Sequence, residues 1–142
     1  MEEFLKKYPL LKDQNVPRET FIDFESFVAM IQKRNEEINI ISKETAKNEI
    51  IRERHIEDSA QVFEFIDLNS KIITDIGSGG GMPGIILSIM LKNLKSPTKV
   101  LLYEKSHHKS AFLRSVSRKL KLNTEIMQKN IFEAENIESG TI

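Results

Sequence analysis

The chain has 142 residues, of which 39% are hydrophobic, and this length and composition suit one globular domain with a single core. Its 21 basic and 21 acidic side chains balance, which excludes a protein whose whole surface is polycationic. The absence of cysteine excludes a disulfide scaffold, a zinc site with Cys ligands and a thiol nucleophile. No apolar run approaches the roughly 20 residues of a membrane span, and residues 1–12 lack the apolar stretch of a secretory signal. We therefore expect a cytoplasmic protein with no membrane partner.

The N-terminal half has the apolar spacing of helices. From residue 17 to residue 66 the hydrophobic residues recur at three-, four- and sevenfold steps, with a break at residues 39–42. Ser42 and Thr45 offer side-chain oxygens that can cap the helix after the break. Residues 1–68 are therefore predicted to form a helical segment.

After Asn69 the pattern changes to alternating strands and helices. The predicted strands cover residues 71–76, 99–104 and 124–128, and the predicted helices cover 83–94 and 106–120. This alternation is typical of an α/β fold with a parallel sheet and right-handed crossovers. Residues 69–142 are therefore predicted to form a partial α/β domain.

The charge is unevenly distributed along this second half. Residues 99–121 carry seven basic side chains and one acidic side chain, beside a glycine-rich loop. This basic segment has two equally favoured interpretations, a solvated helix face or a surface that binds phosphates. Arg114, Arg118 and Lys121 lie opposite the apolar face of the predicted helix, so they are the candidates for contact with a nucleic-acid backbone.

The loop from Asp75 to Gly84 carries the chemistry of this unit. Its glycines permit positive φ angles and let a ligand approach the backbone at the N-terminus of the next helix. A P-loop is excluded because no Gly-Lys-Ser/Thr follows. A dinucleotide fingerprint fits formally, because residues 79–84 read G-x-G-x-x-G and Glu104 ends the next strand, where it can hold a ribose hydroxyl. A tight turn without a ligand is the remaining alternative.

Asp75 favours a cationic ligand at this loop. A carboxylate attracts a sulfonium or an α-amino group and repels a pyrophosphate. The pattern D-x-G-x-G-x-G, followed by an acid at the end of the next strand, resembles motif I and the ribose-binding acid of class I S-adenosylmethionine methyltransferases. This resemblance implies a Rossmann-like fold.

The resemblance narrows to one family. Residues 54–59, R-H-I-E-D-S, look like the R-H-x-x-D-S signature of the RsmG (GidB) family, bacterial guanine-N7 methyltransferases that act on small-subunit ribosomal RNA. Residues 39–41 resemble its N-L-T-like step, and residues 75–85 its D-V-G-[ST]-G-x-G-[LF]-P-G-I loop. Glu104, Lys109 and Phe112-Leu113 match its second strand–helix unit. The resemblance covers about residues 20–133, and its specificity lies in the joint occurrence of these motifs.

The resemblance implies a set of site residues, a cofactor and a partner. The residues implied to bind S-adenosylmethionine are Asp75, Gly77, Gly79, Gly81, Met82, Glu104, Asn130, Ile131 and Phe132. Arg54, His55, Asp58 and Ser59 are implied to face the RNA, although Arg54 and Asp58 at i, i+4 spacing also suit a local ion pair. The partner is 16S rRNA in the small ribosomal subunit, the enzyme is a monomer, and no metal is expected.

No catalytic side chain is expected either, because guanine N7 carries a lone pair and no proton, so its methylation needs alignment and no general base. The competing hypotheses are a nicotinamide-dependent oxidoreductase and an inactive RNA-binding fragment of a methyltransferase. Family members continue past the adenine-binding segment with further strands and an arginine-bearing segment. We therefore expect a sheet that is incomplete at the C-terminus, with an open apolar edge. We also expect this chain alone to bind S-adenosylmethionine weakly and to be inactive or unstable.

Overall fold

The computed structural model describes residues 1–42 and 47–129. The N-terminal half contains the helices α1 (Glu2–Lys7), η1 (Pro9–Gln14), α2 (Arg18–Asn35), α4 (Glu49–Gln61) and η2 (Val62–Phe65). The second half contains β1 (Ile72–Ile76), α5 (Gly84–Asn93), β2 (Lys99–Tyr103), α6 (His107–Leu120) and β3 (Thr124–Met127). All five elements predicted after Asn69 are present, each with ends within about two residues of the prediction. The two short helices that precede α2 lie within the predicted helical segment 1–68, but they were not predicted individually.

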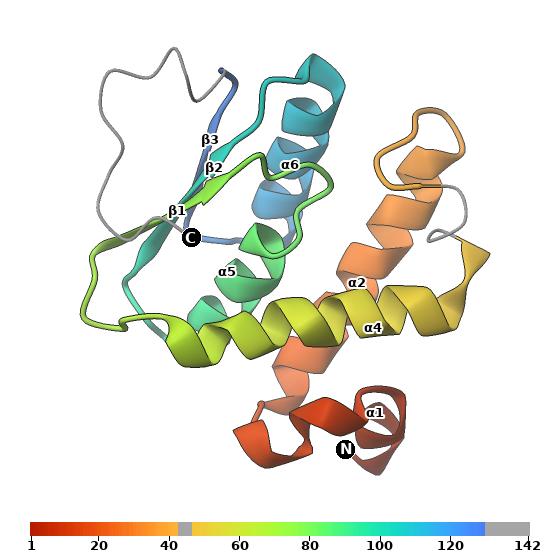
Figure 1. Ribbon diagram of the computed structural model, residues 1–142, viewed down its shortest axis with the longest axis vertical. Helices are drawn as coiled ribbons and strands as arrows, with labels where there is room; N and C mark the ends of the chain where they lie inside the picture. Colours follow the sequence, from red (N-terminus) through yellow and green to blue (C-terminus); the bar gives the residue numbers. More distant parts are fainter. Residues whose placement is uncertain (43–46, 130–142) are drawn as a thin grey trace.

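The three strands form a parallel sheet in the order β1-β2-β3. Because α5 and α6 are successive crossovers in the same direction, they lie on the same face of the sheet (Figure 1). The helices α2 and α4 pack against α5 on the side away from the strands, and α2 also contacts α6. The predicted α/β class with a parallel, Rossmann-like sheet is confirmed.

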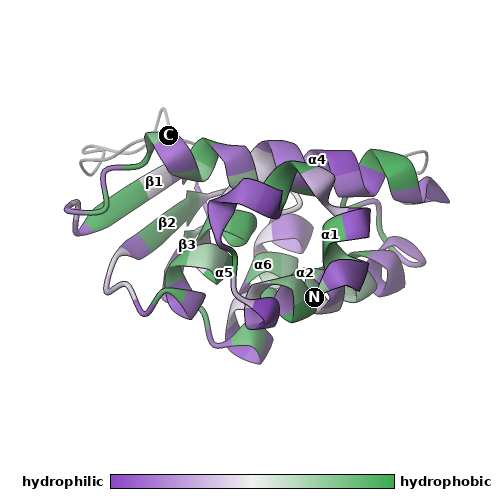
Figure 2. Cartoon of the chain, turned by 90° about the horizontal axis from the view of Figure 1, so that it is seen from below, coloured by the Kyte–Doolittle hydropathy of each residue, from purple (hydrophilic) through white to green (hydrophobic). Residues whose placement is uncertain are grey.

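One hydrophobic core joins the two halves of the chain. Its buried residues run from Tyr8, between α1 and η1, to Leu120 at the end of α6. In α5 every residue from Gly84 to Leu91 is buried, because this helix lies between the sheet and the N-terminal helices. Figure 2 shows the strands as largely hydrophobic and α4 as largely hydrophilic. The change from helices to strand–helix units falls near residue 68, but the core continues across it.

Side-chain caps explain where two of the helices begin. Ser106 accepts a hydrogen bond from the N–H of Lys109 at 3.3 Å and so caps α6. Asn48 accepts from the N–H of Ile51 at 3.1 Å and caps α4. Ser42 lies seven residues before Glu49, where α4 begins, so the cap of α4 itself is Asn48. Thr45, the other predicted cap, lies outside the described residues.

The sheet has exposed apolar residues beside β1. Within residues 47–129 the outer strands are β1 and β3. Ile76 at the end of β1 is 36% exposed, and Leu68 and Phe65, which precede the strand, are 53% and 86% exposed. No helix in the described part of the chain combines the length and apolarity that crossing a membrane requires.

Candidate cofactor-binding site

Three segments that are distant in the sequence meet around one cleft. They are the loop after α2, the middle of α4, and the glycine loop between β1 and α5. The cleft has a volume of about 290 Å³, near the lower end of the roughly 300–1,000 Å³ that small-molecule sites occupy. Its lining residues are Ile41, Ser42, His55, Gly77, Ser78, Gly79, Gly80 and Met82. The structure therefore brings part of the upstream motif together with the glycine loop.

The glycine loop presents its backbone to this cleft. Gly77, Gly79 and Gly81 have φ angles of 70°, 54° and 104°, a region that residues with a Cβ rarely adopt. The N–H groups of Gly77 and Ser78 both donate to the carbonyl oxygen of Tyr103 at 2.9 Å, which fixes the loop to the end of β2. A Cβ built on Gly77 would have no heavy atom within 4 Å. The cleft is thus open beside Gly77, where a ligand can lie against bare backbone.

Asp75 lies beneath the loop and does not line the cleft. Its side chain accepts a hydrogen bond from the N–H of Gly84 at 3.0 Å, joining the end of β1 to the first residue of α5. Burial raises the pKa of Asp75 to about 6, and the hydrogen bond from Gly84 only partly offsets that increase. Asp75 is therefore a structural link in the described residues, and a cation in the cleft can feel its charge only through the loop.

Glu104 holds the glycine loop from the other side. It is 8% exposed and follows directly after β2. Its Oε1 accepts from the N–H of Gly79 at 2.9 Å, and its Oε2 accepts from the N–H of Ser106 at 2.8 Å. The predicted ribose acid thus lies at the edge of the loop that lines the cleft, connected to both the loop and the start of α6.

The upstream motif is divided between two faces of α4. His55 is exposed and lines the cleft, and the buried Ser59 donates its hydroxyl to the carbonyl oxygen of His55 at 2.8 Å. Arg54 and Asp58, at the same i, i+4 spacing but about 100° away around the helix, form an exposed ion pair with 3.7 Å between Nε and Oδ1. The structure therefore places only His55 of these four residues in the cleft.

The loop after α2 is held by a residue that the sequence analysis missed. The side chain of Asn35 accepts from the N–H groups of Ile40 and Ile41 at 2.8 and 3.2 Å and donates to the carbonyl oxygen of Ile41 at 2.9 Å. These residues pack closely on Gly80, where a Cβ would come within 2.8 Å of the Ile41 side chain. Asn35 thus positions one wall of the cleft. An Asn at the end of a helix has many local roles, so the sequence alone carried no signal for this one.

The other predicted site residues lie away from the cleft or outside the described chain. Arg114, Arg118 and Lys121 are exposed on or directly after α6, as predicted, but do not line the cleft. Asn130, Ile131 and Phe132, the predicted adenine contacts, lie outside the described residues. In the described part of the chain, no group of three or more His, Asp and Glu residues is arranged to hold a metal ion.

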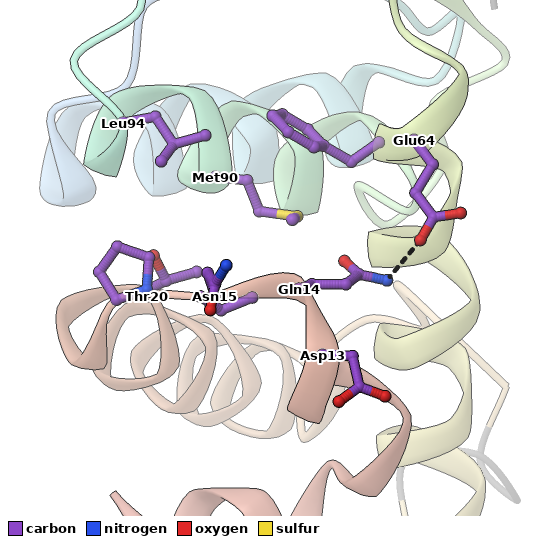
Figure 3. A pocket seen from close by; sticks show the side chains of 10 residues that line it. Asp13, Gln14, Asn15, Thr20, Glu64, Met90 and Leu94 are labelled. Carbon is purple, nitrogen blue, oxygen red and sulfur yellow. Dashed lines mark hydrogen bonds between the residues drawn. The ribbon is translucent and has the colours of Figure 1, made fainter.

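A second cavity lies at the opposite end of α5 (Figure 3). It has a volume of about 200 Å³ and lies between Met90 of α5, Leu94 just after that helix, and the segment from Asp13 to Thr20. The amide of Gln14 donates to Glu64 at 3.5 Å, whereas its oxygen and the Thr20 hydroxyl are buried without a hydrogen-bond partner in the described residues. No predicted site residue lines this cavity, so the cleft at the glycine loop remains the candidate site.

Fold and cleft together define the class of the protein. A parallel sheet whose first strand enters a glycine loop and a helix, with a carboxylate at the end of the second strand, is a Rossmann-like unit of the class I methyltransferase type. A family model described as GidB, rRNA small subunit methyltransferase G, matches residues 21–141. The chain belongs to this family.

Individual relatives agree with the family match. A ribosomal RNA small subunit methyltransferase G from Pelagibacter ubique is 75% identical over all 142 residues, which cover 67% of that protein. Proteins of the same name from Dinoroseobacter shibae and Orientia tsutsugamushi are 34% and 38% identical over 84% and 82% of this chain. These two matches cover 60% and 56% of the relatives' lengths. The chain thus spans only part of the length of all three relatives.

Proposed function

We propose that this protein takes part in the transfer of a methyl group from S-adenosylmethionine to N7 of a guanine in 16S ribosomal RNA. The observation that carries the proposal is the cleft, where the glycine loop, the loop after α2 and His55 meet in a chain of this family. The printed names of the relatives supply the rRNA substrate class. The cofactor and the target atom rest on the chemistry of the site and on the sequence resemblance.

The residues around the cleft suit the cofactor. The bare backbone at Gly77 leaves room for the methionine end, and Met82 lines the same cleft. Glu104 would accept hydrogen bonds from the ribose hydroxyls, because each carboxylate oxygen has a second lone pair beside the one used by the backbone. At pH values above its pKa of about 6, Asp75 would contribute negative potential from beneath the loop. Residues 130–132 would contact the adenine.

The reaction requires alignment of the two substrates. When bound, S-adenosylmethionine supplies a methyl group that accepts the lone pair of guanine N7 while its bond to sulfur breaks, leaving a neutral thioether. This chain's residues then hold the methyl donor in line with N7 and exclude water, a contribution worth roughly 7–11 kcal/mol in well-oriented reactions. His55, which faces the cleft, would contact the guanine or its phosphate, and Arg54 would reach the phosphate from the neighbouring helix face.

The cofactor assignment is tested by calorimetric titration of the 142-residue chain with S-adenosylmethionine and, separately, with NAD. We expect S-adenosylmethionine alone to bind, and Gly77→Val to abolish binding while the chain still folds. Lys95→Val is the matched control, because Lys95 also has a positive φ, of 57°, in an exposed turn. Undiminished affinity in Gly77→Val would contradict the assignment, and binding of NAD in place of S-adenosylmethionine would favour the oxidoreductase.

The transfer step is tested with small ribosomal subunits and methyl-labelled S-adenosylmethionine. Two proteins are compared: the 142-residue chain, and a fusion of it to the part of the Pelagibacter relative that it does not cover. We expect label from the fusion at a guanine where chemical cleavage specific for N7-methylguanosine occurs, and weak or absent transfer by the chain alone. Label at any other atom would refute the N7 assignment. RNA binding without label from either protein would favour the inactive fragment.

A further inference from the structure

A groove lies between the C-terminal part of α2 and the middle of α6, separate from the cofactor cleft. It has a volume of about 310 Å³, and its lining residues are Met30, Lys33, Arg34, Glu37, Phe112, Ser115 and Lys119. Phe112 is buried and stacks on Phe27 of α2 with 6.4 Å between ring centroids, so the floor of the groove is a rigid contact between the two helices. The groove is therefore a fixed feature of the packed core with polar side chains at its rim.

The rim of this groove carries an excess of positive charge. Lys33 and Arg34 on α2 and Lys119 on α6 line it, against the single carboxylate of Glu37. None of the three cations forms an ion pair with a residue in the described ranges 1–42 and 47–129. Uncompensated cations on two facing helices create a positive potential that attracts anions.

The arrangement favours a polyanion over a single small anion. Besides Lys119, the helix α6 carries the exposed Arg114 and Arg118, which do not line the groove. The positively charged surface therefore extends beyond the groove. Two of the groove's cations lie in the last turn of α2, where the helix dipole disfavours an isolated phosphate and side chains must supply the attraction. A row of cations spread over two elements matches the repeating charge of a sugar–phosphate backbone.

The groove and the cofactor cleft are linked through one short segment of the chain. Arg34 precedes Asn35, whose side chain holds Ile40 and Ile41, and Ile41 lines the cleft beside the glycine loop. The segment that leaves the groove therefore becomes the wall of the cleft within seven residues. An RNA strand bound in the groove would thus contact the same segment of the chain that forms one wall of the cleft.

We propose that the α2–α6 groove binds the backbone of the substrate RNA next to the target nucleotide, with Lys33, Arg34 and Lys119 contacting phosphates. This inference rests on the proposed function and names the surface that holds its substrate. The contacts from α2 are new, because the RNA contacts expected from the sequence lie only on α4 and on or directly after α6.

The test compares two triple variants of the 142-residue chain with equal changes in net charge. The groove variant is Lys33→Gln, Arg34→Gln and Lys119→Gln. The control is Lys6→Gln, Lys12→Gln and Lys71→Gln, three exposed cations on α1, on η1 and just before β1. Affinity for a fragment of 16S rRNA is measured by fluorescence anisotropy over a series of KCl concentrations, and folding of each variant is checked by its thermal unfolding curve.

We expect the groove variant to lose at least tenfold in affinity near physiological salt. The slope of log affinity against log salt should become shallower by about two, because each lost phosphate contact on a single strand removes about 0.7. The control should keep the slope of the unchanged chain. Equal slopes in the two variants, or no RNA binding by the unchanged chain, would overturn the proposal. Titration with S-adenosylmethionine distinguishes failure of the proposed function from failure of the groove proposal. If S-adenosylmethionine does not bind, the cofactor assignment is refuted, whereas the RNA-binding result for the groove still holds.

Discussion

Replacement of Asn35 by alanine tests whether the wall of the cofactor cleft depends on one side chain. The substitution removes three hydrogen bonds, two accepted from the N–H groups of Ile40 and Ile41 and one donated to the carbonyl oxygen of Ile41. Ile40 is only 3% exposed, so its N–H would be left buried and unpaired, whereas the half-exposed Ile41 can turn its polar groups to water.

The size of the effect follows from these exposures. A buried polar group that loses its partner costs about 1–3 kcal/mol, and a group that water can reach costs less than this. We therefore expect Asn35→Ala to lower the free energy of unfolding by about 2–3 kcal/mol. Because the freed loop packs on Gly80 and lines the cleft, affinity for S-adenosylmethionine should also fall, by roughly tenfold for each 1.4 kcal/mol needed to restore the bound loop.

The assay combines urea denaturation with calorimetric titration. Asn123→Ala is the matched control, because the Asn123 amide also bridges a loop, donating to the carbonyl oxygens of Pro97 and Thr98 at 3.1 and 3.2 Å, before β3 and far along the chain from the cleft. We expect both variants to be destabilised and only Asn35→Ala to lose affinity. Equal affinity for S-adenosylmethionine in the two variants would show that Asn35 stabilises the fold without positioning the cleft.

Three further substitutions probe β1 and its link to α5. Gly84→Ala should destabilise the chain by about 1–3 kcal/mol in thermal unfolding, because its Cβ would collide with the Asp75 carboxylate and the Leu102 side chain; an unchanged midpoint would contradict the close packing. Asp75→Asn should gain stability relative to the unchanged chain as pH rises from about 4 to 7, with a change of up to about 3 kcal/mol in the difference between their free energies of unfolding. The reason is that the raised pKa of Asp75 makes the folded state of the unchanged chain bind a proton more tightly than its unfolded state, so the unchanged chain loses stability when that proton dissociates. Urea titrations at both pH values measure this difference, and a constant difference would refute it. Thr74→Val should leave stability unchanged or raise it by about 1 kcal/mol, because the buried Thr74 hydroxyl has no hydrogen-bond partner in the described residues; a loss of more than that in the same urea titrations would reveal a partner.

The strand–helix units could be predicted from the sequence because their signals are local. A β-branched run at residues 72–76, followed by glycines, marked β1, and apolar residues on one face of the segment 106–120 marked α6. The short helices before α2 escaped prediction, since a six-residue 3-10 segment starting at Pro9 has no periodicity to detect. They are held by long-range contacts, such as the bond from the N–H of Leu10 to the Glu57 carboxylate at 2.7 Å.

The candidate site was predicted in outline, and the residues that position it were not. The family resemblance singled out both the segment around His55 and the glycine loop, and residues of both line the cleft. The sequence did not reveal that Asp75 bonds to Gly84, nor that Asn35 holds residues 40 and 41. These bonds join residues five to nine positions apart across a chain reversal, so no fixed periodicity indicates them.

The two backbone hydrogen bonds to Glu104 bear on the entropy of ligand binding. By accepting from Gly79 and Ser106, this carboxylate fixes the glycine loop and the start of α6 in one arrangement before any ligand arrives. If the segment were ordered only during binding, the free-energy cost of ordering it would reduce the affinity, by about 0.5–1.5 kcal/mol for each flexible side chain that is immobilised. Here that ordering is completed when the sheet forms. The glycine loop is thus preorganised, and its conformational entropy is lost during folding, before a ligand binds.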